Sequence, residues 1–285
     1  MTKKKKTLPA NFNELLEAKD LDALKAVFNE CELNAYDRRS FKTPALSFYK
    51  IPLELMDWLI AQGADINAKD NMGAQCDRAY THNGGGYLPQ ALKAIKIYLN
   101  AGLKPTEYAR ERLTIIGEDF EFRRADTNSE WLEEADASLQ ELYILFDVPP
   151  VPRRIQHDGK SPIMLSGDTW EKQYEQAWNL LVPGNGKANT LQGEVIRIAG
   201  RINDELLHNG MGNWDRDYRK MLSIISNFLK QGNSLTTEQL AEVAHIQKNI
   251  LEDDGTLSHR LCKLTTLWVS QNPNPIELEK VPYNR

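Results

Sequence analysis

The stretch GADINAKDNMG, residues 63–73, decides how the first part of the chain is interpreted. Its centre has a counterpart upstream: residues 33–35 and Asp37 match residues 66–68 and Asp70. The offset is 33 residues at every matched position. A run of apolar residues with helical spacing precedes each copy. A fixed offset of this size indicates a repeated unit of helix and turn, rather than a turn that is used once.

Asp65 and Asn67 alternate like the first ligands of a calcium-binding loop, but the rest of that pattern is missing. The third ligand position holds the cation Lys69, and Asp70 stands where the sharp turn needs a glycine. Cys76 occupies the position of the bidentate glutamate. The stretch therefore predicts a turn and not a metal site. We expect no metal and no cofactor in this protein.

Three features of this region resemble ankyrin repeats. Gly63 stands where the unit's second helix ends, and glycine accepts the positive φ of such an end. Thr43-Pro44 resembles the start of the unit's first helix, where threonine can cap and proline suits the first position. Residues 70–73 resemble the hairpin tip. The chain thus resembles a divergent ankyrin-repeat protein over residues 10–110.

The departures from the ankyrin pattern begin after Pro44, where Ala-Leu stands in place of Leu-His. The next unit has AQCD at 74–77 instead of the Thr-Pro pair, followed by the inserted loop THNGGGY at 81–87. Three glycines in that loop allow an anion-binding nest of backbone N–H groups, but they are more typical of an insertion between helices. These departures indicate divergent repeats, in which the helical scaffold is retained and the recognition surface has changed.

The resemblance implies a scaffold that offers hairpin tips and a concave face to a protein partner. The tips project away from the core, and insertions on one face of such a stack often contact the partner. The candidate partner-binding residues are Asp37, Arg38, Arg39, Asp70, Asn71, Met72, His82 and Tyr87.

The remaining chain also predicts helices, so we expect an all-α fold with an N-terminal ankyrin-like repeat stack and a C-terminal helical bundle. A helix over 127–146 would cap the repeat stack. Four prolines over 148–166 exclude regular structure there. Five apolar stripes with helical spacing follow. The expected parts are a disordered basic leader (1–9), repeats with a capping helix (10–147), a linker (148–166), a helical bundle (167–271) and an extended, poorly ordered tail (272–285).

A second stripe runs along the helix predicted over 190–208, beside its apolar one. Its members are Glu194, Arg197, Arg201, Glu205 and His208, at spacings of 3, 4, 4 and 3. Such spacing allows alternating ion pairs on a solvated face. The alternative is a polar pocket in which the arginines bind an anion, which would make these five residues a small-ligand site.

Charge and composition indicate which class of molecule the protein can bind. The formal net charge is −5 although residues 3–6 are all lysine, so the rest of the chain is acidic. An acidic protein repels phosphate backbones, which argues against nucleic acid and favours a basic protein. No apolar run is long enough for a membrane span. Three separated cysteines fit a reducing compartment, so we expect a cytoplasmic protein without a membrane partner.

The sequence contains no catalytic motif that we recognise. The five histidines have no metal-binding spacing, and no nucleophile elbow is present. We therefore expect a non-enzymatic protein–protein interaction module. By analogy with acidic proteins that block toxins, its more specific form is a bacterial immunity protein, an antitoxin that binds a basic toxin domain. The alternative is an enzyme or an anion-binding protein with its site in the C-terminal helices.

Overall fold

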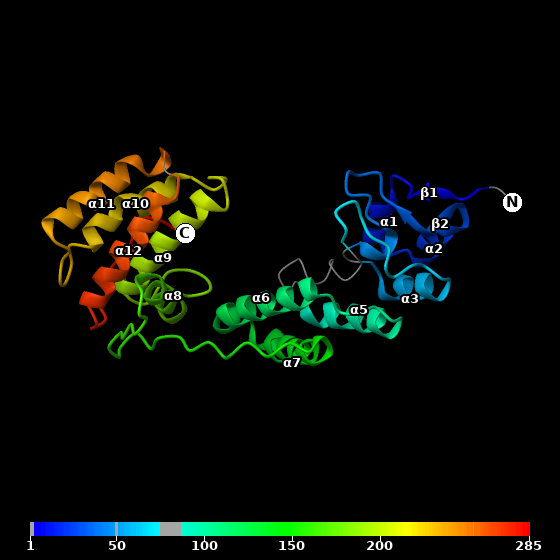
Figure 1. Ribbon diagram of the computed structural model, residues 1–285, viewed down its shortest axis with the longest axis horizontal. Helices are drawn as coiled ribbons and strands as arrows, with labels where there is room; N and C mark the ends of the chain where they lie inside the picture. The colour runs from blue at the N-terminus through cyan, green and yellow to red at the C-terminus, as the bar shows by residue number, and fades with distance from the viewer. Residues whose placement is uncertain (1–2, 49–50, 75–86, 253) are drawn as a thin grey trace. The chain divides into compact units, whose positions relative to one another are not determined.

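The structure, a computed structural model, describes residues 3–48, 51–74, 87–252 and 254–285 (Figure 1). The chain divides into two compact units, Met1–Pro152 and Arg153–Arg285. The described residues are mostly helical and form one two-stranded sheet, so the predicted all-α class is confirmed at this level. The boundary between the units falls within residues 148–166, which form neither helix nor strand.

The first unit is a succession of helices, each packed on the next. Its elements are β1 (Lys5–Thr7), α1 (Phe12–Ala18), α2 (Leu21–Glu30), β2 (Cys31–Tyr36), the 3₁₀ turn η1 (Ala45–Ser47), α3 (Leu53–Ala61), α5 (Leu88–Asn100), α6 (Glu107–Arg123), the 3₁₀ turn η2 (Arg124–Asp126) and α7 (Ser129–Phe146). Helix α1 packs on α2, α2 on α3, and α3 on α5. Helix α7 packs on both α5 and α6. The helix predicted over 127–146 thus begins at Ser129 and covers α5.

The apolar runs of the two matched units face one core. Leu24 and Phe28 of α2 and Leu55 and Leu59 of α3 are buried. The rings of Phe28 and Trp58 lie 6.0 Å apart between the two helices. The stripe predicted from helical spacing therefore corresponds to the packed face of each helix.

The expected helix at Thr43-Pro44 is reduced to a single 3₁₀ turn. Pro44 precedes η1, which is only three residues long. Pro52 then stands at the N-cap of α3. Proline disfavours a helical conformation in the residue before it, so Ile51 cannot carry a helix into α3.

The prediction of a disordered leader over residues 1–9 is wrong for its second half. Residues 5–7 form β1, which pairs in parallel with β2. Leu8 is buried, and its N–H donates to the carbonyl of Tyr36. Lys4 and Lys5 also bond to the end of α2, through the carbonyl of Phe28 and the carboxylate of Glu30. The free backbone groups of β2 and the apolar side chain of Leu8 outweigh the lysines' preference for water.

The second unit contains the five helices that the sequence predicts. They are α8 (Trp170–Leu181), α9 (Leu191–Leu207), α10 (Arg216–Phe228), α11 (Thr237–Asn249) and α12 (Thr256–Gln271), with the 3₁₀ turn η3 (Ile250–Glu252). Helices α8, α10 and α12 all pack on α9. Threonine or aspartate side chains cap the starts of α8, α9, α10 and α11. Because α9 has neighbours on several sides, polar residues outside its apolar stripe are buried as well.

The tail over 272–285 is extended, but the prediction that it is poorly ordered is wrong. Val281 and Tyr283 are buried. Gln192, at the start of α9 and fully buried, donates to the carbonyls of Asn272 and Asn274 and accepts from the N–H of Ile276. A buried side-chain amide that satisfies three backbone groups compensates the entropy lost on ordering the segment.

Candidate functional site

The predicted contacts at the hairpin tips fall into two groups, and the first group serves the turns themselves. The carboxylate of Asp37 accepts from the N–H of Thr43. The carboxylate of Asp70 accepts from the N–H groups of Met72 and Ala74. These aspartates shape their own loops, as Asx turns do. One carboxylate oxygen of each aspartate is thus already used inside the chain.

Asn71 joins the two tips. Its backbone N–H donates to the carbonyl of Phe41 at 2.8 Å, and its side-chain amide donates to the carbonyl of Ser40 at 2.9 Å. One turn earlier, the N–H of Asp65 donates to the side chain of Asn34 at 2.8 Å. The matched turns therefore lie side by side, which the sequence offset alone could not establish.

The second group of tip residues points to solvent, and its charge is positive. Arg38, Arg39 and Met72 are exposed, and so is Phe41, which the sequence did not single out. Lys42 and Lys69 add further positive charge to the same two turns. Like charges repel across an interface. A basic partner would therefore have to bind elsewhere on the unit.

The other two predicted contacts come from the inserted loop. His82 lies outside the described residues. Tyr87 stands at the N-cap of α5 and is half exposed. Its ring packs edge-on against Trp131 of α7, with centroids 5.5 Å apart, and its hydroxyl donates to Glu134 at 3.2 Å. Tyr87 therefore belongs to a surface on α7 rather than to the hairpin tips.

We call this surface the α7 face; it consists of Tyr87, Glu130, Trp131, Glu133 and Glu134. All five side chains are exposed, Trp131 by 51% and Tyr87 by 48%. Among the residues that the structure describes, neither Glu130 nor Glu133 has an ion-pair partner. Residues three and four apart share one side of a helix, so Glu130, Glu133 and Glu134 lie together on the side of α7 next to Trp131. The sequence holds this signal in SEWLEE, residues 129–134, but local spacing does not show that Trp131 packs on Tyr87.

An ion-pair clamp fixes α7 against α6 next to this face. Arg124 donates three bonds to Glu121 at the end of α6 and two to Asp136 on α7, at 2.7–3.1 Å. Its guanidinium also lies 4.6 Å from the ring centre of Phe120. Planar, bidentate pairing of this kind holds side chains in one geometry. The α7 face is thus presented on a positioned helix.

The α9 residues do not form the solvated face that was expected. Glu194, Arg197 and Glu205 are each exposed by 2% or less. Arg201 is partly buried, and only His208 is exposed, where it pairs with Asp204 at 3.0 Å. The prediction is wrong because α8, α10, α12 and the tail cover the stripe, so only the last turn of α9 reaches solvent.

Glu194 and Arg197 pair with each other and with the tail. The guanidinium donates twice to the Glu194 carboxylate, at 2.6 and 2.8 Å, and once to the carbonyl of Arg285 at 2.8 Å. The hydroxyl of Tyr283 donates to Glu194 at 2.6 Å. Burial alone would raise the pKa of Glu194, but Arg197, Tyr283 and the N–H of Ala188 together lower it below its usual value. The anion that Arg197 holds is therefore the chain's own.

The pKa values of Arg201 and Glu205 are both lowered, but for different reasons. Burial and the nearby charge of Arg197 lower the pKa of Arg201. Burial opposes ionisation of Glu205, but donors from Asn209 and Asn213 lower its pKa overall. Glu205 thereby fixes the loop between α9 and α10.

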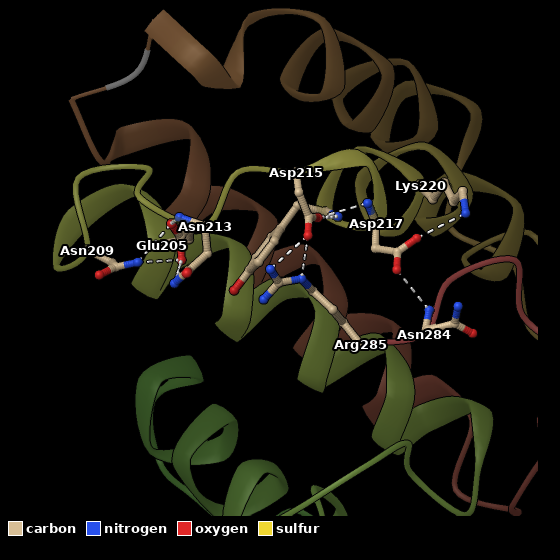
Figure 2. A network of polar contacts seen from close by, with 9 residues as sticks. Glu205, Asn209, Asn213, Asp215, Asp217, Lys220, Asn284 and Arg285 are labelled. Carbon is tan, nitrogen blue, oxygen red and sulfur yellow. Dashed lines mark hydrogen bonds and ion pairs between the residues drawn. The ribbon is translucent and has the colours of Figure 1, made fainter.

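Figure 2 shows how the start of α10 completes the tail's attachment. Asp215 caps α10 with one carboxylate oxygen and accepts from the Arg285 guanidinium with the other, at 2.7 and 3.0 Å. Asp217 accepts from Lys220 and from the N–H of Asn284. We call Glu194, Arg197, Asp215, Asp217 and the tail residues 283–285 the tail clasp. Most of its polar groups pair with one another, and these pairs hold the tail against α9 and α10.

Comparisons with known proteins identify no relative, so the role of these residues is inferred from their contacts alone. No family model matches the chain, and no curated protein or solved structure matches it either. Among the described residues, no group of three or more histidine, cysteine or acidic side chains could hold a metal ion. The helices within the described ranges are all too short or too polar to cross a membrane.

Proposed function

We propose that the protein is a non-enzymatic protein-binding module that holds a basic partner on the α7 face. One observation carries the proposal: two exposed aromatic rings, in contact with each other, lie beside carboxylates that lack ion-pair partners among the described residues. Exposed aromatics are a common source of binding energy at interfaces. Carboxylates around them attract and orient a cationic partner. The hairpin tips, which carry positive charge, would not contact that partner.

The scaffold in this proposal is a divergent ankyrin-like stack over residues 10–110. The hydrogen bonds from Asp65 to Asn34 and from Asn71 to Ser40 support it, because they join matched turns of consecutive units. The 3₁₀ turn in place of one helix is the main departure. The proposal assigns the protein to the cytoplasm, in keeping with two free buried thiols, Cys31 and Cys262.

A capture experiment tests the α7 face directly. The full chain is immobilised at low salt and exposed to a lysate of the cells that produce it, and bound proteins are identified. We expect a basic partner whose binding weakens on Trp131→Ala, by about tenfold or more for a hot-spot aromatic. Glu130→Lys combined with Glu133→Lys should abolish capture, because like charges then oppose each other.

The matched control is Glu14→Lys combined with Glu17→Lys on α1. These glutamates are also exposed, three residues apart on a helix and without ion-pair partners among the described residues. The control should keep the partner. Equal loss in both double variants would reduce the effect to net charge, and capture that ignores Trp131 would rule out the α7 face.

The more specific form of the proposal is toxin neutralisation in bacteria, with a basic toxin domain as the partner. The acidic, exposed α7 face supports it. Co-expression with a basic toxin identified by the capture experiment should restore growth, and Trp131→Ala should remove that protection. Protection that persists in the variant, or no basic toxin among captured proteins, would refute this form while leaving protein binding open.

A small-ligand site on α9 was the alternative. The Nη1 atom of Arg197 is buried without a hydrogen-bond partner among the described residues, but the other contacts of this guanidinium oppose such a site. An incoming anion would have to displace Glu194 and the carbonyl of Arg285 from Arg197. Thermal-shift measurements with nucleotides, sugars and metal ions remain a direct test. Clear stabilisation by one of these compounds, lost in Arg201→Ala, would support the alternative.

A further inference from the structure

A groove of about 520 Å³ lies between α10 and α11 in the second unit. The two helices run side by side (Figure 1). Trp214, Leu222, Ala244 and Leu251 provide its apolar surface. Leu251 is 49% exposed although it is a large apolar residue. Apolar surface that remains open to solvent at a concave site is typical of a binding groove.

The groove is held in shape by contacts on both walls. Trp214 stacks on Tyr218, with ring centroids 5.5 Å apart, and Arg285 of the tail clasp lies 4.9 Å from the same tyrosine ring. On the other side, the side-chain amide of Gln247 on α11 donates to the carbonyls of Leu222 and Ser223 on α10. A preformed site costs little conformational entropy when it binds.

Charge at the groove is positive and unpaired. Arg219 of α10 and Lys248 of α11 line it, both exposed, and neither has an ion-pair partner among the described residues. None of the described lining residues is acidic. Elsewhere in this unit Lys220, Arg260 and Arg285 each pair with a carboxylate. The two unpaired cations therefore share one groove with its apolar surface.

We propose that this groove binds a short acidic segment of a partner protein. A large apolar side chain of the segment packs on Trp214 and Leu251, and flanking carboxylates pair with Arg219 and Lys248. A small acid fits less well, because small-ligand sites enclose most of their ligand and most residues lining this groove are exposed. The inference is independent of the proposed function: it concerns residues of the other unit and a partner of opposite charge.

The test is a selection of random dodecapeptides, displayed on phage, against the full-length protein. We expect one enriched class with acidic residues on both sides of a large apolar residue. Peptides that bind the α7 face would be basic, so the two proposals yield different classes. A chemically synthesised member of the acidic class, labelled with fluorescein, then provides affinities by fluorescence polarisation.

Charge reversal identifies the site. Arg219→Glu combined with Lys248→Glu should weaken the acidic peptide by at least about tenfold, because two attractions become repulsions. Lys263→Glu, an exposed lysine on α12 that does not line the groove and has no ion-pair partner among the described residues, should leave its affinity within about twofold. Leu251→Ser should also weaken binding without changing the charge, which separates docking from general attraction.

Two results would overturn the inference. One is that the selection enriches no acidic peptide class. The other is that enriched acidic peptides bind the double variant as tightly as the wild type, or lose affinity equally in Lys263→Glu. A third measurement guards against misfolding: the circular dichroism spectrum and melting temperature of each variant should match the wild type, since both cations are exposed and unpaired.

Discussion

Helices α7 and α9 are close in length, 18 and 17 residues, and both carry glutamates beside an apolar stripe. On α7 these glutamates are exposed and largely unpaired, whereas on α9 Glu194 and Glu205 are buried and fully engaged. The difference comes from their neighbours: α5 and α6 pack on α7, but α8, α10, α12 and the tail surround α9. The same residue type is therefore left exposed to solvent on one helix and serves internal cohesion on the other.

The largest expected effect comes from Arg197, the cation that pairs with the buried Glu194 on α9. Arg197→Met leaves the Glu194 carboxylate buried without its cation, which we expect to destabilise the second unit by about 3–5 kcal/mol. Amide hydrogen exchange measures this loss of stability, since it gives the protection of α9 and of α7 separately. Protection of α9 should fall while that of α7 is unchanged. Adding Glu194→Leu should recover part of the loss, because the carboxylate that had lost its cation is then removed.

The control is Lys172→Met, which breaks the exposed pair with Asp168 on α8. Exposed ion pairs contribute little, so hydrogen exchange should match the wild type within error. If Arg197→Met behaved like this control, the tail clasp would have no structural role.

The same substitution at two tyrosines compares the regions directly. Tyr283→Phe removes the buried hydrogen bond to Glu194 and should cost about 1–3 kcal/mol of unfolding free energy. Tyr87→Phe removes an exposed bond to Glu134, where water replaces the lost donor, and stability should not change measurably. Urea unfolding measures the unfolding free energy of both variants. Equal effects would mean that Tyr283 is not buried against Glu194 in solution.

Helical stripes allowed most of the fold to be predicted. All five helices of the second unit follow from apolar spacings such as Leu191, Val195, Ile198 and Ile202, because each helix buries one face. Helix α6 escaped prediction: its apolar positions are interrupted by Gly117 and by the buried Glu121. Gly117 is small because the hydroxyl of Tyr143 packs against it, and that contact comes from a distant part of the chain.

The candidate site was less predictable than the helices. Tyr87 was identified, but its partner Trp131 was not, because their contact joins α5 to α7 across 44 residues. The burial of Arg197 depends on residues 283–285, which resemble an ordinary polar tail. Local spacing shows which residues share a helix face. It does not show which other segment covers that face.

Acid should weaken the second unit selectively. The pKa of Glu194 is lower in the folded state than its ordinary value of 4.5, so its contribution to stability is present above that value and is lost as pH falls through the folded pKa. Each unit of depression corresponds to about 1.4 kcal/mol. We expect hydrogen-exchange protection of α9 to fall below pH 4.5. Glu194→Gln should flatten that pH dependence; an unchanged profile would assign it to other carboxylates.

The smallest expected effect has the opposite sign. Glu133 on α7 is exposed beside Glu130 and Glu134, and like charges at helical spacing repel. Glu133→Gln should therefore stabilise the first unit by roughly 0.2–0.5 kcal/mol at low salt. Added salt should remove the gain, because it screens exposed charges. Urea unfolding at low and high salt measures both. A loss of stability would mean that Glu133 has a partner in solution, and the α7 face would then lack the free charge that sets it apart from α9.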